Sequence, residues 1–225
     1  MVPFTRRHFI KSGTLLTANL VVTGMHGCIP KSGWGAQNEF LQTSCGEEKQ
    51  AAKKVLIAYA SMHGSTGEVA DALAKDLCAA GASVDIRLVG TVRDLSPYQA
   101  VVVGSAIRSD RWLPEANEFV ASHRSILSNI PIAYFLTCLT LTKPSAEART
   151  KVQSFLNPVR EEFPEVKSVS TGLFAGVLDY NKYSTAIKAV MKYKMWAKGV
   201  EEGDYRDWQA IHAWANQLKS AFLSA

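Results

Sequence analysis

The sequence predicts an α/β fold in which a five-stranded parallel sheet, wound in the order 2-1-3-4-5, carries helices on both faces. Two observations lead to this prediction. From residue 53 onward, short apolar runs alternate with segments whose apolar residues recur at helical spacing. Most of the apolar runs are nearly continuous, as in strands that are buried on both sides. The 225 residues, 47% of them hydrophobic, are enough for one such domain.

Strands are expected at the apolar runs and helices between them. The predicted strands span 54–60, 83–88, 98–104, 131–138 and 166–174. The predicted helices span 68–80, 113–127, 145–157 and 207–222. In the second strand Val84, Ile86 and Leu88 alternate with polar residues, which indicates an edge position. With this strand order a ligand binds at the carboxyl ends of the first and third strands, where the winding reverses.

A loop of small hydroxyl residues and glycine follows the first predicted strand. It consists of Ser61, Met62, His63, Gly64, Ser65 and Thr66. Free backbone N–H groups at the start of the following helix, together with the helix dipole, favour an anion. The loop lacks the Gly-Lys-Ser/Thr ending of nucleoside-triphosphate loops and the three glycines of dinucleotide folds. It therefore indicates a monophosphate, that of flavin mononucleotide (FMN); the alternative is that Ser65 only caps the helix.

Small or polar residues also follow the third and fourth predicted strands. They are Ser105, Ala106, Ile107 and Arg108 in the first cluster, and Thr137, Cys138, Leu139 and Thr140 in the second. Such residues suit the faces and the pyrimidine edge of a flavin ring. Arg108 has two open roles, meeting the reduced ring or an acidic substrate, or pairing with Asp110. Cys138 is expected to pack and His63 to cap the turn, and the sequence identifies neither a catalytic acid or base nor a metal site.

Residues 1–28 resemble a twin-arginine export signal. Arg6 and Arg7 are followed by an aromatic residue, an aliphatic residue and Lys11, and then by a mildly apolar run that is too short to span a bilayer. The resemblance implies that the twin-arginine export machinery carries the folded, cofactor-loaded protein to the periplasm or the outer side of the inner membrane. Residues 29–52 would then be a flexible linker and 53–225 the domain. A lipid-modified Cys28 stays an alternative.

Charge and cysteine spacing narrow the function further. Without the leader, 22 basic and 20 acidic residues leave a net charge of +2, because the three basic residues that leave, Arg6, Arg7 and Lys11, take no acid with them. This balance does not suggest a nucleic-acid partner. The four cysteines show no C-x-x-C or metal spacing and are not expected to form a disulfide framework, although a bridge between Cys28 and Cys45 stays open.

Four motifs, taken in this order, resemble the flavodoxin superfamily and, within it, the menaquinone-dependent protoporphyrinogen oxidases. They are the segments 61–66, 103–108, 175–180 and 205–208, within a likeness that covers about 54–222. The resemblance implies an FMN enzyme that passes electrons between a small organic reductant and a membrane quinone. The alternatives are an electron-transfer protein without its own substrate, which would typically be acidic around the ring, and a degenerate domain that binds another ligand.

The segment 180–198 stands where simple flavodoxins have little. Five lysines alternate there with aromatic and aliphatic residues. A basic helix of this kind can lie on an anionic membrane surface or cover a quinone-sized apolar site. The alternative is an ordinary surface helix that packs its apolar side on the domain.

Overall fold

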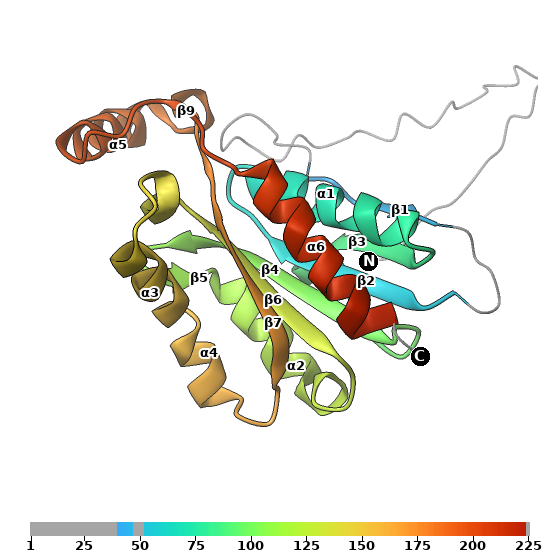
Figure 1. The fold of residues 1–225 in the computed structure, drawn as a ribbon. Helices are drawn as coiled ribbons and strands as arrows, with labels where there is room; N and C mark the ends of the chain where they lie inside the picture. The colour runs from blue at the N-terminus through green and yellow to red at the C-terminus, as the bar shows by residue number, and fades with distance from the viewer. Residues whose placement is uncertain (1–39, 47–51, 224–225) are drawn as a thin grey trace, which may run out of the picture. The chain divides into compact units, whose positions relative to one another are not determined.

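A mostly parallel sheet lies at the centre of the part of the chain that the computed structural model describes, residues 40–46 and 52–223 (Figure 1). All of these residues belong to the second of two units into which the chain divides, Gly35–Ala225. The segment predicted to be an export signal, 1–28, lies outside the described residues, so export stays a prediction.

The elements follow one another along the chain as alternating strands and helices. The strands are β1 (Thr43–Cys45), β2 (Lys54–Ala60), β3 (Ser83–Leu88), β4 (Ala100–Arg108), β5 (Arg111–Trp112), β6 (Ile132–Cys138), β7 (Ser168–Ala175), β8 (Val177–Leu178) and β9 (Gly203–Asp204). The α-helices are α1 (Ser65–Ala79), α2 (Pro114–Leu127), α3 (Ala146–Ser154), α4 (Asn157–Glu162), α5 (Thr185–Ala197) and α6 (Trp208–Leu223). Single 3₁₀ turns are η1 (Val89–Thr91), η2 (Leu139–Thr142) and η3 (Tyr180–Lys182).

The sheet has the order β1-β3-β2-β4-β6-β7, with β5 paired to β4 outside this path. Strands β3, β2, β4, β6 and β7 are parallel. They correspond to the five predicted strands in the predicted order 2-1-3-4-5, so the predicted fold class is confirmed.

Helices cover both faces of the sheet (Figure 1). Along β2 the side chains alternate: Val55, Ile57 and Tyr59 pack in a core with α1 and α6, whereas Leu56 and Ala58 pack in a second core with α2, α3 and α4. Because β2 is buried on both faces, its sequence has no polar alternation. This double burial holds the carboxyl ends of the strands in place.

Two predicted boundaries differ from the structure. The third predicted strand continues to Arg108, because β5 folds back and pairs with its end. The predicted helix 145–157 is divided into α3 and α4, and Pro158 stands at the start of α4. A proline has no N–H to donate and is favoured in the first turn of a helix, which explains the division at this position.

Strand β1 corrects the prediction of a flexible linker over 29–52 at residues 43–45, within the part of that range that the structure describes. Residues 43–45 pair antiparallel with β3, so the outermost strand of the described sheet is β1 and not, as predicted, the strand 83–88. Cys45 forms a disulfide bond with Cys78 of α1. The prediction that the cysteines form no disulfide framework was therefore wrong for this pair, and the alternative of a bridge from Cys45 to Cys28 is not the one formed.

Residues 176–207 form an insertion between β7 and α6. It contains the two-stranded sheet of β8 and β9, the turn η3 and the helix α5. Figure 1 shows α5 beyond the end of the sheet, away from the two helical layers. Among the residues that the structure describes, no helix is long and apolar enough to cross a membrane.

Candidate functional site

The predicted phosphate loop joins β2 to α1. Gly64 adopts a left-handed conformation, with φ 92°, and immediately precedes the first residue of α1, Ser65. Its N–H donates to Oγ of Ser61 at 3.0 Å, which closes the turn. A residue with a side chain would be strained at this φ, so glycine is required for the chain to enter the helix here. The first turn of this 15-residue helix thus faces the loop with its N–H groups.

Thr66, at the start of α1, also contacts the sheet. Its side chain is fully buried, and its hydroxyl forms a 2.8 Å hydrogen bond with that of Thr137 at the end of β6. This bond ties the phosphate loop to the fourth predicted strand. Ser65 and the backbone amides at the start of α1 are further groups that can hold an anion.

The cluster Ser105, Ala106, Ile107 and Arg108 lies on β4 itself rather than in a loop. Oγ of Ser105 is buried, donates to the carbonyl of Ala106 at 2.8 Å and accepts from the N–H of Leu113 at 3.0 Å. Ser105 thus holds the start of α2, while Arg108 is exposed at the hairpin. Asp110 forms an ion pair with Lys151 at 3.2 Å, so it has a partner other than Arg108.

The strand register brings the three predicted clusters to one edge of the sheet. Ala60 of β2 pairs with Ser105 of β4. Ala106 of β4 pairs in turn with Thr137 of β6. The loop 61–66, the end of β4 and the residues Thr137, Cys138, Leu139 and Thr140 therefore meet at the carboxyl edge, as predicted.

A depression beside the phosphate loop brings two of the predicted loop residues, His63 and Ser65, together with residues that the sequence did not single out as ligands. It is lined by His63, Ser65, Glu68, Val177, Asp179, Lys182, Tyr183 and Arg206. The ring of Tyr183 lies 4.5 Å from that of His63. The guanidinium of Arg206 contacts Glu68 and Asp204, both at 2.7 Å, and lies over the ring of Trp208. The insertion thus contacts the phosphate loop and the start of α1. In the sequence, the tail motif 205–208 was the feature that could have drawn attention to Arg206.

Electrostatics at this edge keep two ionisable groups neutral. Burial, reinforced by the charge of Lys182, lowers the pKa of His63 below its usual value, so the ring is neutral at pH 7. Burial raises the pKa of the Cys138 thiol. A protonated, buried thiol is a poor nucleophile, which agrees with the expected packing role of Cys138.

An FMN fits this edge of the sheet. The left-handed turn at Gly64 leaves open space where a side chain would stand, and the N-terminus of α1 supplies amide donors for a phosphate. The ends of β4 and β6 offer small, half-buried or buried residues, such as Ala106 and Cys138, beside which a flat ring can pack. No lysine is required, because main-chain amides supply the donors.

The chain belongs to the flavodoxin domain family, whose model matches residues 56–204. This membership agrees with the fold and with the prediction of FMN as the cofactor. A short-chain flavodoxin associated with a non-canonical PDU bacterial microcompartment has the same fold, with a TM-score of 0.50, 12% identity, and coverage of 75% of this chain and 98% of that one.

Two curated relatives are similar in sequence. The protoporphyrinogen IX dehydrogenase [quinone] of Leishmania major is 29% identical over 183 residues, which cover 76% of this chain and 77% of the relative. The protein of the same name from Escherichia coli K12 is 27% identical over 175 residues, 73% of this chain and 94% of the relative. The chain is thus a flavodoxin-like flavoprotein with homology to oxidoreductases.

Proposed function

We propose that this chain is an FMN-dependent oxidoreductase that passes electrons from a reduced organic molecule of the protoporphyrinogen type to a membrane quinone. The observation that carries the proposal is the insertion between β7 and α6. It contacts the first turn of α1 through the pair Arg206–Glu68 and the phosphate loop through the rings of His63 and Tyr183. A quinone or membrane surface that met the insertion would therefore lie next to the flavin.

In this proposal, different segments of the chain bind the phosphate and orient the ring of FMN. The amides of Ser65 and the adjacent turn bind the phosphate, and the ends of β4 and β6 orient the ring. Bound FMN supplies a centre that accepts and releases two electrons. Arg108, exposed at the hairpin next to this edge, offers a positive charge to the reduced ring or to an acidic substrate.

Helix α5 carries an exposed apolar surface that we assign to the membrane. Val190, Tyr193 and Trp196 recur at three-residue steps and are 53%, 70% and 76% exposed. Lys192 and Lys194, the sequence neighbours of Tyr193, project about 100° to either side of it. An apolar face flanked by lysines suits an anionic bilayer surface, where the lysine heads reach the phosphates.

Only a small part of α5 packs on the domain. Met195 is buried against a minor core formed by Leu178, Tyr180 and Val200. The alternative of an ordinary surface helix predicts that the apolar side is buried and the lysines face solvent. The lysines do face solvent, but Val190, Tyr193 and Trp196 face it as well. These exposed apolar side chains are what supports the membrane assignment, since they take no part in packing on the domain.

The location that we propose is the outer side of the inner membrane or the periplasm. The support is the twin-arginine pattern around Arg6 and Arg7 in the sequence. An exported enzyme with a membrane-surface helix would meet quinone from that side.

A spectroscopic experiment tests the function. Purified protein should contain FMN at about one per chain, bleach on anaerobic reduction, and recover its absorbance when a menaquinone analogue in anionic vesicles is added. Steady turnover of a reduced porphyrinogen with quinone would establish the enzyme. Reoxidation by quinone without any porphyrinogen turnover would favour the alternative of an electron-transfer protein, and a colourless protein that ignores added FMN would contradict both.

A further inference from the structure

Residues 40–46 form a strap along the outer edge of the sheet, opposite in direction to β3. The carbonyl of Leu41 accepts a 2.9 Å hydrogen bond from the hydroxyl of Tyr59, a fully buried residue. Oε1 of Gln42 accepts from the hydroxyl of Thr91 at 2.8 Å. The strap thereby accepts hydrogen bonds from polar groups of the domain, which would lose these partners if the strap left.

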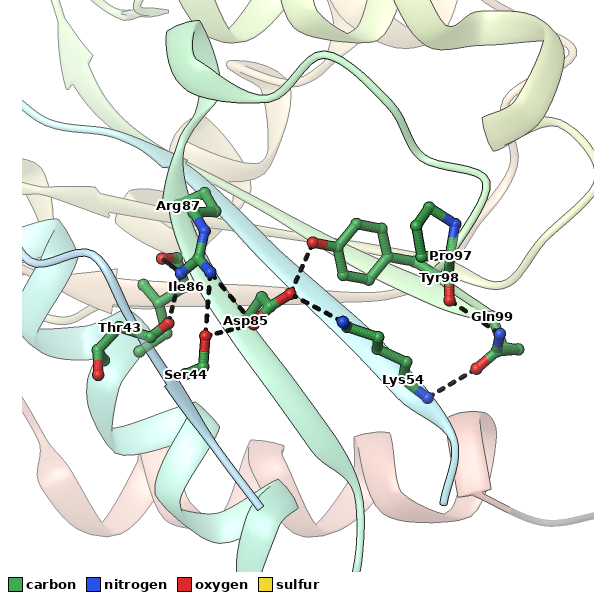
Figure 2. Close-up of polar contacts among 9 residues, drawn as sticks. All are labelled: Thr43, Ser44, Lys54, Asp85, Ile86, Arg87, Pro97, Tyr98 and Gln99. Carbon is green, nitrogen blue, oxygen red and sulfur yellow. Dashed lines mark hydrogen bonds and ion pairs between the residues drawn. The ribbon is translucent and has the colours of Figure 1, made fainter. Parts of the chain in front are cut away.

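Figure 2 shows the strap meeting the charged cluster around Asp85. Ser44 donates a hydrogen bond to the carboxylate of Asp85, and the guanidinium of Arg87 donates to the carbonyl of Thr43 at 2.7 Å. The hydroxyl of Tyr98 donates to the same carboxylate at 2.8 Å. Asp85 is only 7% exposed, so each of these donors compensates for the water it has lost.

The disulfide fixes the end of the strap to another element. Cys45 is the last residue of β1, and Cys78 lies near the end of α1, 33 positions later. Cys45 pairs with Val84 near the start of β3, which places the disulfide toward the amino edge of the sheet. The phosphate loop lies at the opposite, carboxyl edge. The disulfide is therefore remote from the flavin site.

We propose that oxidation of Cys45 and Cys78 is a maturation step that locks the strap onto the domain after export, and that reduction releases the strap from β3. Each thiol loses one proton, the two sulfurs form a bond, and two electrons pass to a disulfide of a thiol oxidant protein, whose own sulfur–sulfur bond breaks to give two thiols. The proposal rests on the proposed export of the chain but not on the proposed substrate.

A short strap needs such a lock. Strand β1 has three residues, and a pairing this short at an exposed edge contributes little against the entropy of ordering the chain. The covalent bond keeps the strap beside its partners, and it persists in oxidising compartments but not in the cytosol. Release would uncover the outer backbone groups of β3, an edge to which other chains could add.

The test compares two samples of the full-length chain. One is exported from cells, and the other is retained in a reducing cytosol. Peptide mapping without reductant should show Cys45 joined to Cys78 in the exported protein and both thiols free in the retained protein. Reduction of the exported protein should lower its melting temperature by about 10 °C and speed chymotryptic cleavage after Phe40 or Leu41 at least ~10-fold, with FMN absorbance unchanged.

The control is the double variant Cys45→Ser with Cys78→Ser. It should match the reduced wild type in melting temperature and cleavage, and it should not respond to reductant, whereas Cys28→Ser should behave as wild type. Free thiols at 45 and 78 in the exported protein, or a bond from Cys45 to Cys28, would overturn the proposal. So would unchanged stability and cleavage on reduction of wild type, a measurement that remains available if the double variant does not fold.

Discussion

Apolar side chains are buried in the central sheet but largely exposed on helix α5. In β4, Val101, Val102 and Val103 are fully buried, whereas in α5 Val190 is 53% exposed. Burial of the sheet residues stabilises the fold, because each removes apolar surface from water. The apolar residues of α5 contribute little to that stability. The buried residues of the sheet therefore specify the fold, whereas the exposed apolar residues of α5 do not.

The largest change is expected at the phosphate loop, whose residues belong to the fold and also bind the ligand. Ser65→Glu should lower FMN affinity by about 100-fold or more, because a carboxylate would stand beside the phosphate at the N-terminus of α1. Flavin titration measures the effect, and circular dichroism checks the fold. Ser65→Ala is the matched control and should lose no more than about 10-fold. Equal affinities for the Glu and Ala variants would show that the phosphate binds elsewhere.

A matched pair of valines tests the sheet against α5 directly. Val102→Ala should lower the free energy of unfolding by about 2 kcal/mol, since it leaves a cavity between packed strands and helices. Val190→Ala should change it by less than about 0.5 kcal/mol. Denaturant titration of the two variants measures both values. A similar loss for Val190→Ala would mean that α5 packs on the domain in solution and would contradict its assignment as an outward surface.

The membrane assignment of α5 predicts a loss of binding without a loss of stability. Replacing Val190, Tyr193 and Trp196 by serine should weaken binding to anionic vesicles at least ~10-fold, because the exposed apolar area is what enters the interface. Sedimentation with vesicles measures it. Val169→Ser is the control, because Val169 is equally exposed, at 53%, but lies on β7. Binding that does not change in the triple variant would remove the membrane from the proposal.

The sheet could be predicted because each strand is recognisable from the residues of that strand alone. Strands such as 54–60 are buried on both faces, so a continuous apolar run is enough to recognise them. The phosphate loop was predictable for a similar reason, since the strand, Gly64 and the helix follow one another directly in the sequence. The insertion was noticed through its lysines, but its exposed aromatic face depends on how little of α5 packs on the domain.

Long-range contacts could not be predicted in this way. Arg206 meets Glu68 across 138 positions, and no local pattern pairs them. The strap was taken for linker because three residues in a polar segment give no strand periodicity, and Cys45 reaches Cys78 only once β1 has paired with β3. The hydrogen bond between Thr66 and Thr137 joins residues 71 positions apart, so no local pattern could predict it either.

The smallest change is expected in the pH dependence of stability, through the charged cluster around Asp85. Burial acts to raise the pKa of Asp85, but hydrogen bonds from Ser44 and Tyr98 and the charges of Arg87 and Lys54 outweigh it, so the pKa is lowered. A carboxyl with a lowered folded-state pKa stabilises the protein above its unfolded value of about 3.9 and loses that contribution as the pH falls through the folded-state pKa. Asp85→Asn should therefore lower stability at pH 7 and flatten its decline below about pH 4.

The exposed Asp94 is a suitable control for this experiment. Its pKa is also lowered, through hydrogen bonds from Ser96, but neither bond involves the strap, and Asp94 is open to solvent. Asp94→Asn should leave the chymotryptic cleavage of the strap unchanged, whereas Asp85→Asn should speed it, because Ser44 would then face an amide in place of a carboxylate. Melting curves between pH 3 and 7 measure the first effect and cleavage rates the second. If the Asp85 variant kept the wild-type acid slope and the wild-type cleavage rate, the strap would be held by its other contacts, and the charged cluster would have no part in closing that edge.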